Sequence, residues 1–325
     1  MGQESKTEQV LQQSKTPEER LKEQDEAVRL NPKDPESHFK RGDALQSMNR
    51  YVEALKEYEA AIHLNKKIAR YHEARSWSLM SLNKNNDALK AVEEAIHLDP
   101  KEASYHSRRA FLLGTSGKYQ DAMKESDIAI GLNPNNAESH HQKGNLLQRL
   151  GRYDEALREF KTAAGLMPTN YVYHYVTARL LNQVGRYPEA LVEYDAATQL
   201  RPDHADSHWG RASVLDEMQR REEALGECDL AIQLVPNNYN YHMTKGVIFS
   251  HLKRYEETLK ECDILVQLFP NDANSHSARG SAVGLLGRHA EEVSEHEIAM
   301  RLDPKDPRHR LNRDATLRAW KTSGR

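Results

Sequence analysis

Eight of the 16 histidines in this 325-residue chain recur at one interval. Each lies 34 residues from the next, and they are His38, His72, His106, His140, His174, His208, His242 and His276. A fixed period of this size is typical of arrays in which one small structural unit is stacked on the next. We therefore expect a linear array along most of the chain, although the length alone would suggest two or three compact domains.

Other residue types recur at the same interval. With Pro35 as position 1, eight repeats without insertion or deletion fill residues 35–306. Position 8 is always small, position 20 is alanine in the first six repeats, and position 32 is proline in every repeat except the first, which has Lys66. The repeats are residues 35–68, 69–102, 103–136, 137–170, 171–204, 205–238, 239–272 and 273–306.

Apolar residues within each repeat follow helical spacing. In residues 137–170, Leu146 and Leu147 belong to a first apolar run, and a second run contains Phe160. Gly151 between the runs can adopt the left-handed conformation that ends a helix, and the proline at position 32 stops the second helix. Each repeat is therefore predicted to be two antiparallel helices, called here the A helix and the B helix.

The two ends of the chain depart from the full repeat. Residues 16–34 form an incomplete leading repeat, which Thr16–Glu19 opens with the signature of a capping box. Residues 1–15 have few apolar side chains, and we expect them to be frayed or disordered. Residues 307–325 are predicted to be a capping helix with a basic tail, whose charges suit a solvent-facing end of the array better than a docking helix.

This pattern resembles the tetratricopeptide repeat, whose signature is W-x2-L-G-x2-Y…A-x3-F…P over 34 residues. The fourth repeat matches it with Gly144, Leu147, Ala156, Phe160 and Pro168. Histidine replaces the tryptophan at position 4 throughout. Cys228, Cys262 and His296 replace the aromatic residue at position 24, while Thr258 and Glu292 replace the small residue at position 20. We expect the last two repeats to pack least well.

The resemblance implies an all-α fold, an α-solenoid that winds as a right-handed superhelix. In this family the A helices line a concave groove, and positions 2, 5, 9, 12 and 13 chiefly face it. The candidate peptide-binding residues at or near these positions are Phe39, Trp77, Met80, Phe111, His141, Asn145, Arg149, Tyr175, Arg179, Asn182, Trp209 and Met243. Exposed aromatic side chains are common anchors of a binding site. In the alternative interpretation, Trp77 and Phe111 pack against neighbouring A helices.

Two specialised members of the family can be tested by residue. Members that clamp the C-terminal carboxylate of Hsp70 or Hsp90 use Lys, Asn and Arg at set positions. The nearest register here has His141, Asn145, Val176, Asp206 and Gly210. The asparagine ladder at position 6 of O-linked N-acetylglucosamine transferase is missing as well. We expect neither a chaperone carboxylate nor that ladder's ligand to bind.

The histidine column is not expected to hold a metal. Equivalent residues of stacked helices lie roughly 8–10 Å apart, whereas each imidazole ligand must come within ~2.1 Å of a zinc ion. We expect each histidine to fill a buried slot with one ring nitrogen hydrogen-bonded. Burial would then lower its pKa, and stability would fall as the pH drops below ~6.5. By the same spacing argument, Cys228 and Cys262 are predicted to be free thiols in the core.

Composition and motifs limit the function. The net charge is -3, no apolar run reaches the ~18 residues of a membrane span, and the chain start lacks the apolar run of a signal peptide. No phosphate loop, nucleophile elbow or Cys/His metal spacing is present. We therefore expect a non-enzymatic cytoplasmic scaffold or adaptor without cofactor, binding an extended peptide or helix of a partner protein. The alternative is single-stranded RNA on Trp77, Phe111, Arg149 and Arg179.

Overall fold

The computed structural model describes residues 15–322, which contain eighteen helices and no strand. The chain divides into two compact units, Met1–Leu166 and Met167–Arg325, called here the N-terminal and C-terminal units. The segment predicted to be frayed or disordered lies outside the described residues apart from Lys15. None of the helices in residues 15–322 is long and apolar enough to cross a membrane.

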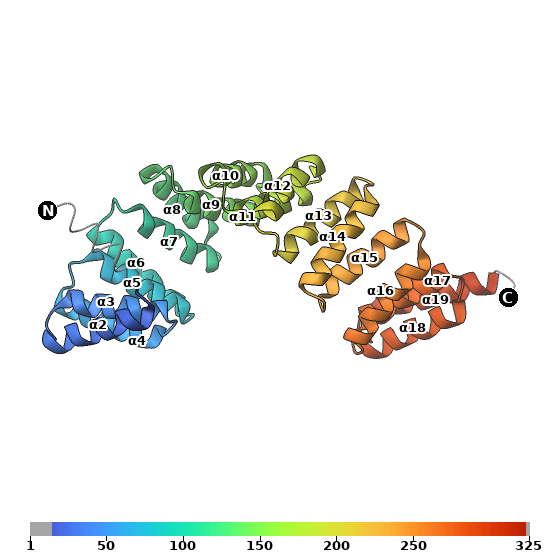
Figure 1. The fold of residues 1–325 in the computed structure, drawn as a ribbon, viewed down its shortest axis with the longest axis horizontal. Helices are drawn as coiled ribbons and strands as arrows, with labels where there is room; N and C mark the ends of the chain where they lie inside the picture. Colours follow the sequence, from blue (N-terminus) through green and yellow to red (C-terminus); the bar gives the residue numbers. More distant parts are fainter. Residues whose placement is uncertain (1–14, 323–325) are drawn as a thin grey trace. The chain divides into compact units, whose positions relative to one another are not determined.

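The N-terminal unit contains α2 (Pro17–Leu30), α3 (Pro35–Ser47), α4 (Tyr51–Leu64), α5 (Ala69–Ser81), α6 (Asn85–Leu98), α7 (Ala103–Thr115), α8 (Tyr119–Leu132), α9 (Ala137–Arg149) and α10 (Tyr153–Leu166). The C-terminal unit contains α11 (Tyr171–Gln183), α12 (Tyr187–Leu200), α13 (Ala205–Glu217), α14 (Arg221–Leu234), α15 (Tyr239–His251), α16 (Tyr255–Leu268), α17 (Ala273–Leu285), α18 (His289–Leu302) and α19 (Pro307–Thr322). Within each unit the helices follow one another in chain order (Figure 1). The predicted all-α solenoid of helix-turn-helix repeats is confirmed.

The turn between the A and B helices has one backbone feature in all eight repeats. Position 15 adopts a positive φ, between 59° and 78°. Glycine occupies it four times, and the other four residues are Asn49, Asn83, Gln219 and Lys253. Left-handed backbone is easy for glycine and costs other residues roughly 1–2 kcal/mol. The prediction that Gly151 ends an A helix is confirmed, since its φ is 73°.

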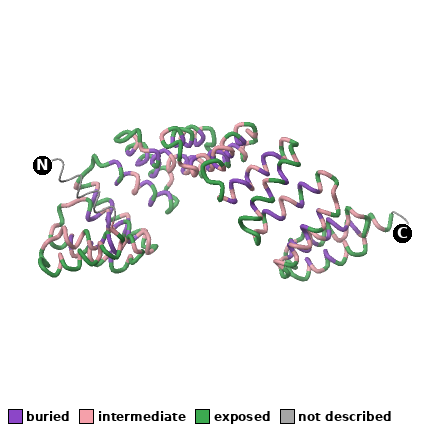
Figure 2. The backbone as a smooth tube through the Cα atoms, viewed as in Figure 1, coloured by how far each residue is buried: buried purple, intermediate pink, exposed green. Residues whose placement is uncertain are grey.

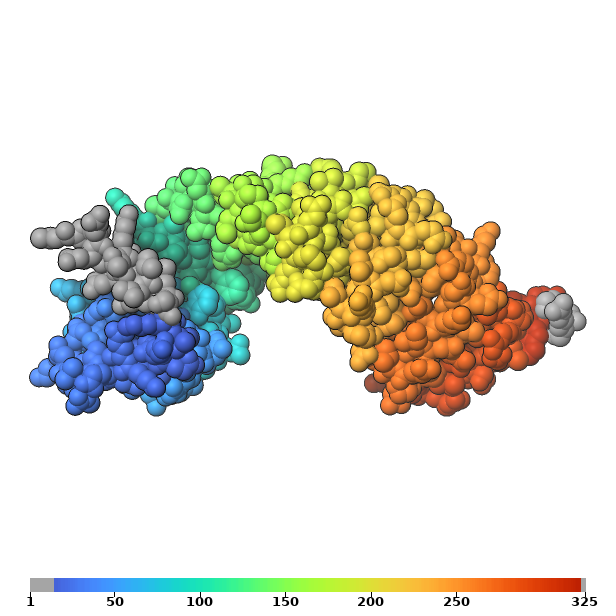
Figure 3. All heavy atoms as spheres, viewed as in Figure 1, coloured from blue at the N-terminus to red at the C-terminus, as the bar shows by residue number. Residues whose placement is uncertain are grey.

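Small residues allow neighbouring helices to approach closely. The alanines at position 20 of repeats one to six, and those at position 27 of every repeat except the seventh, are fully buried. The buried residues therefore lie between helices along both units, as Figure 2 shows. In Figure 3 consecutive colours adjoin within each unit, so that each helix pair packs directly on the next. A larger side chain at these alanines would separate two helix backbones.

A glycine at position 8 is matched by a ring at position 24 of the same repeat. A Cβ atom added at Gly42 would lie 2.5 Å from the Tyr58 ring, and one at Gly144 would lie 2.5 Å from the Phe160 ring. Both rings are fully buried. Position 8 is therefore small in these repeats because the ring of the B helix lies directly on the A-helix backbone.

The last two repeats, which we expect to pack least well, differ in how the space at their substituted positions is filled. In the eighth repeat the His296 ring lies against Gly280, at 2.9 Å from a Cβ added there. Glu292 fills the space beside Gly284, and its carboxylate accepts a hydrogen bond from Thr316. The seventh repeat instead leaves a cavity beneath Gly246.

The histidine column joins each repeat to the preceding one. At position 4 the ring Nε2 lies 2.8–3.1 Å from the backbone oxygen of position 32 of the preceding repeat, in all eight repeats. In seven repeats Nδ1 lies 2.6–2.8 Å from a glutamate at position 23. Repeat two has Ala91 there. Both ring nitrogens are engaged in those seven repeats, one more than expected, and are thus unavailable to a metal ion.

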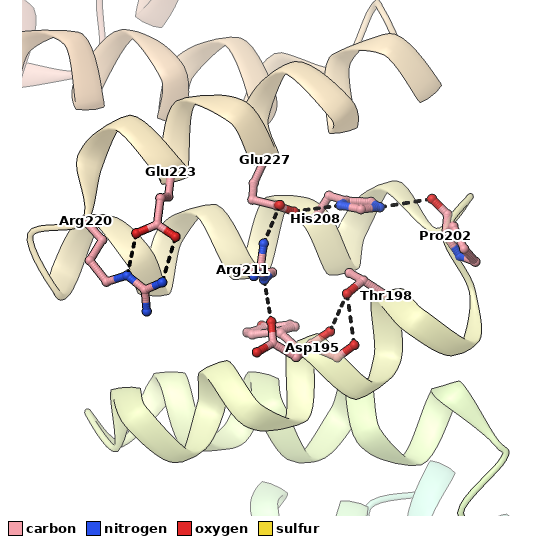
Figure 4. Close-up of polar contacts among 9 residues, drawn as sticks. Asp195, Thr198, Pro202, His208, Arg211, Arg220, Glu223 and Glu227 are labelled. Atoms are coloured by element: carbon pink, nitrogen blue, oxygen red, sulfur yellow. Dashed lines mark hydrogen bonds and ion pairs between the residues drawn. The ribbon is translucent and has the colours of Figure 1, made fainter.

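A basic residue extends this chain of contacts, as Figure 4 shows for the sixth repeat. Arg211 donates one hydrogen bond to Glu227, the partner of His208, and another to Asp195 of the preceding repeat, at 2.6 Å. Position 7 is Arg or Lys in seven repeats and Thr177 in repeat five. In six of these repeats the cation is bound between one carboxylate of its own repeat and one of the repeat before, whereas Arg75 of repeat two pairs only with Glu59 of the preceding repeat.

The protonation of His208 differs from the expectation. A backbone oxygen and an ionised carboxylate can only accept, so the His208 ring, which bonds one of each, donates from both nitrogens and carries a charge. The hydrogen bond to Glu227 raises the pKa of His208 despite its burial. Burial raises the pKa of Glu227, but the contacts with His208 and Arg211 outweigh it, and the pKa is lowered. His208 is buried as expected, yet the expected lowering of its pKa is wrong.

The predicted capping box and the two predicted free cysteines are confirmed. Thr16 and Glu19 form a capping box at the start of α2. In α19, Arg310 is exposed at position 4, where every full repeat has histidine. Cys228 and Cys262 are free and buried, and burial raises the pKa of each thiol to about 12.

We predict that Gly144→Ala lowers the free energy of unfolding by about 1–3 kcal/mol, because the new methyl group overlaps the Phe160 ring. Gly131→Ala is the matched control in the same unit, since no atom lies within 4 Å of a Cβ added there. The control should leave stability unchanged or raise it by up to ~1 kcal/mol. Urea denaturation followed by circular dichroism measures both, and equal stability of the two variants would contradict the contact.

We predict that the stability difference between the wild type and His208→Gln depends on pH. The folded pKa of His208 lies above its unfolded value of ~6.5. Its contribution is therefore complete below that pH and is lost as the pH rises through the folded pKa. The gap between the two melting temperatures should be larger at about pH 6 than at about pH 8.5. A gap that widens toward high pH would show that the neutral ring is the stabilised form.

Candidate functional site

In the A helices of repeats two to four, the side chains at positions 5 and 9 lie on the side opposite the buried face. Residues four apart share a face of a helix, and positions 5 and 9 therefore stand on one side. Position 11 lies on the buried side, where Leu79 and Leu113 are almost completely covered. Position 9 carries Trp77 on α5 and Phe111 on α7.

These two aromatic side chains line an open cavity of about 390 Å³ in the N-terminal unit. Trp77 is 38% exposed and Phe111 is 43% exposed. Met80 lines the same cavity and also packs on the core beneath it. Neighbouring helices therefore leave substantial parts of both rings uncovered, and the structure brings three of the predicted residues to one cavity.

A charged pair from two repeats borders the cavity. The guanidinium of Arg108 lies over the Trp77 ring, 4.2 Å from its centroid. Arg108 also forms an ion pair with Glu73 of the preceding repeat at 2.7 Å. Both charged side chains are mostly buried. The arrangement fixes the Trp77 ring in place, and the negative charge of Glu73 compensates the cation beside it.

Polar groups from α7 and α9 form the other wall of the cavity. The hydroxyls of Ser107 and Ser139 share a hydrogen bond of 2.8 Å. The Gln142 amide donates to Glu138 at 3.0 Å. The oxygen of that amide is buried and has no hydrogen-bond partner among residues 15–322.

The other predicted residues of the N-terminal unit lie outside this cavity. Phe39 is half-buried against Tyr58 and Tyr71, with centroid distances of 5.8 and 4.9 Å. His141 and Asn145 contact each other at 3.2 Å on α9. Arg149, at the end of the same helix, is exposed.

In the C-terminal unit the predicted aromatic residues are more firmly held by their neighbours. Tyr175 is half-buried and lies against His204 at 5.0 Å, and burial raises its pKa. Arg179 is exposed beside Tyr175, and Asn182 is half-buried. The Trp209 ring nitrogen donates to Thr244 at 2.8 Å.

Met243, the last predicted residue of the C-terminal unit, lines a different cavity, which belongs to the seventh repeat. The predicted residues of this unit therefore do not gather at one site.

Sequence reasoning missed Arg108 and Gln142. Both residues occupy position 6 of their repeats. The Arg108 side chain contacts Trp77, which occupies position 9 of the preceding repeat. A signal was present, since a basic residue near an exposed tryptophan favours a cation–π contact.

One acidic group in the described part of the chain has the spacing of metal ligands. Asp303, Asp306 and His309 bring potential ligand atoms within 4.8 Å of one another. Arg308 already engages the Asp306 carboxylate through its side chain and backbone, and these contacts lower the pKa of Asp306 to about 2. The carboxylate serves as the N-terminal cap of α19, and we assign no ligand to the group.

Comparison with solved structures shows the same fold in several proteins. YrrB, described as a tetratricopeptide-repeat protein with an unusual peptide-binding site, is 24% identical, with a TM-score of 0.50 over 58% of this chain and 97% of YrrB. Pseudomonas aeruginosa PilF is 16% identical, with a TM-score of 0.58 over 64% of this chain and 95% of PilF. A tetratricopeptide-repeat protein of Parabacteroides merdae is 13% identical, with a TM-score of 0.57 over 77% of this chain and 98% of its own.

Family models match the sequence directly. Models described as tetratricopeptide repeat match residues 35–68, 73–137 and 137–170, and one described as TPR repeat matches residues 178–219. These matches together span more than half of the chain. A search of curated proteins finds no match. The pairing of helices, the buried alanines and these matches agree, and the chain belongs to the tetratricopeptide-repeat family.

Proposed function

We propose that this protein is a non-enzymatic scaffold that holds a segment of a partner protein against the A helices of repeats two to four. The observation that carries the proposal is the open cavity lined by Trp77, Met80 and Phe111. Large apolar side chains in an open cavity are the usual anchors of a protein interface. The family as a whole consists of protein-interaction scaffolds, which agrees with this use of the surface.

The polar wall of the cavity supports a peptide as the ligand. The exposed side chains of Ser104 and Glu138 line the cavity beside the aromatic residues. Their oxygen atoms can accept hydrogen bonds from the backbone N–H groups of a bound peptide. The cavity therefore combines an apolar anchor with an acceptor for the main chain, which suits an extended segment or the exposed end of a helix.

The charges of the cavity favour a peptide over single-stranded RNA. RNA binding needs uncompensated cations for phosphates and free aromatic faces for bases. Arg108 is paired with Glu73, and its guanidinium lies over the Trp77 ring. A base that stacked on the face of the ring that Arg108 covers would have to displace Arg108 from its ion pair with Glu73. The two free buried thiols agree with a reducing compartment, and we propose that the scaffold acts in the cytoplasm.

We predict that the double substitution Trp77→Ala and Phe111→Ala weakens peptide binding by roughly 10- to 100-fold, the typical effect of losing a buried aromatic anchor. Peptides are first selected from a random phage library on the wild-type protein, and their Kd is then measured by fluorescence anisotropy. Tyr153→Ala is the matched control, because Tyr153 is 37% exposed but lies on α10, a B helix. The control should bind as the wild type does.

The same experiment distinguishes the alternatives. Peptides that bind the double variant as tightly as the wild type would exclude this cavity as the binding site. A labelled oligouridine that binds at physiological salt, and loses affinity in the double variant, would replace the peptide with RNA. Circular dichroism should show that both variants keep the wild-type helix content, since the substituted side chains are partly exposed.

A further inference from the structure

The seventh repeat breaks the rule that a glycine at position 8 is covered by a ring. Glycine occupies position 8 in repeats one, four, seven and eight. In three of these repeats the glycine lies beneath Tyr58, Phe160 or His296, the residue at position 24. The seventh repeat keeps Gly246 but has Cys262 at position 24. A Cβ added at Gly246 would have its nearest neighbours at 3.5 and 4.0 Å, so the place of the ring is empty.

The missing ring leaves a cavity of about 200 Å³ between α15, α16 and α17. Gly246 and Cys262 lie on its wall together with Thr258 and Leu265 of α16 and Ala282 of α17. Apolar atoms make up most of this wall. An apolar cavity of about 150 Å³ is sufficient to hold a benzene molecule, and the space in the seventh repeat is therefore large enough for a phenyl ring.

The cavity opens on the A-helix face of the C-terminal unit. Met243 and Val247 of α15 and Leu285 of α17 line it at positions 5, 9 and 13. Val247 is 41% exposed and Leu285 is 46% exposed. A side chain that approaches along the A helices can therefore enter without disturbing the helix pairs.

We propose that this cavity binds an aromatic side chain of a partner protein, which supplies the ring that the seventh repeat lacks. The inference rests on the proposed function, because it assumes that a partner segment lies along the A helices. An aromatic ring is the expected occupant because the rings of Tyr58 and Phe160 fill the equivalent space in repeats one and four. The partner ring would cover Gly246 as those rings cover Gly42 and Gly144.

The helix beyond the cavity indicates the charge of the partner segment. Asn312 of α19 lies 3.4 Å from Ser277 of α17, so α19 adjoins the helix that lines the cavity. Residues Pro307–Thr322 contain five Arg or Lys and one Asp, and three of the cations, Arg308, Arg310 and Arg313, pair with Asp306 or Asp314. Because positive charge remains in excess after this pairing, we expect acidic residues next to the aromatic residue of the partner, on the side that faces α19.

Two methionine methyl groups report the two sites separately. Met80 lines the cavity of repeats two to four, and Met243 lines the cavity of the seventh repeat. The probe is N-acetyl-phenylalanine amide, with N-acetyl-alanine amide as the control, titrated into ¹³C-methyl-methionine protein and followed by NMR. We expect the phenylalanine probe to shift the Met243 signal with a millimolar Kd, in keeping with the small size of the ligand.

Variants then assign the shift. Cys262→Phe fills the cavity from within, and should abolish the Met243 shift while raising the melting temperature. Cys262→Ala is the matched control, because it leaves the cavity open and should preserve the shift. Trp77→Ala with Phe111→Ala should remove a Met80 response and leave that of Met243 intact. In the wild-type protein, a missing Met80 response alone would therefore count against the proposed function. A missing Met243 response alone would count against this inference.

Two results would overturn the inference. One is a Met243 signal that does not move with the phenylalanine probe in the wild type, and the other is a shift that persists unchanged in Cys262→Phe. The charge is tested with Ac-Phe-Glu-Glu-NH₂ against Ac-Phe-Lys-Lys-NH₂. The acidic peptide should bind several-fold more tightly, with a difference that shrinks in high salt. Equal affinities would reject the acidic flank.

Discussion

The histidine at position 4 fixes the register between successive repeats. In seven of the eight repeats its two ring nitrogens contact the backbone oxygen at the end of the preceding repeat and a glutamate of its own repeat, as His208 does with Pro202 and Glu227. The bonds need both partners in place at once, which sets how far each helix pair is displaced from the previous one. Every surface formed by several A helices, including both cavities, depends on that displacement. The charged contacts therefore determine the binding surface although they lie away from it.

The fold could be predicted because its cause is local and repeated. Close helix packing needs small residues at the same positions in each repeat, and these alanines and glycines are visible in the sequence without any alignment. The protonation of His208 could not be predicted from the histidine column alone. The charge depends on residues at two other repeat positions, Glu227 at position 23 and Arg211 at position 7. Acidic residues recur at the first position and basic residues at the second. Each column seen alone looks like an ordinary solvated helix face.

The candidate site was only partly predictable, because periodicity gives the face of a helix but not the contacts of a side chain. Trp77 and Phe111 share the expected face and remain exposed. Trp209 shares that face as well, but its ring nitrogen is bound to Thr244 of the next repeat. The cavity beneath Gly246 arises because the seventh repeat combines a glycine at position 8 with Cys262, instead of an aromatic ring, at position 24. Neither residue is unusual by itself.

The left-handed residue in each turn divides the repeats into two groups. Glycine at this place costs little, whereas Asn49, Asn83, Gln219 and Lys253 hold the same conformation under strain. That strain is released when the end of the A helix opens. The first, second, sixth and seventh repeats should therefore exchange the amide hydrogens of their turns sooner than the others.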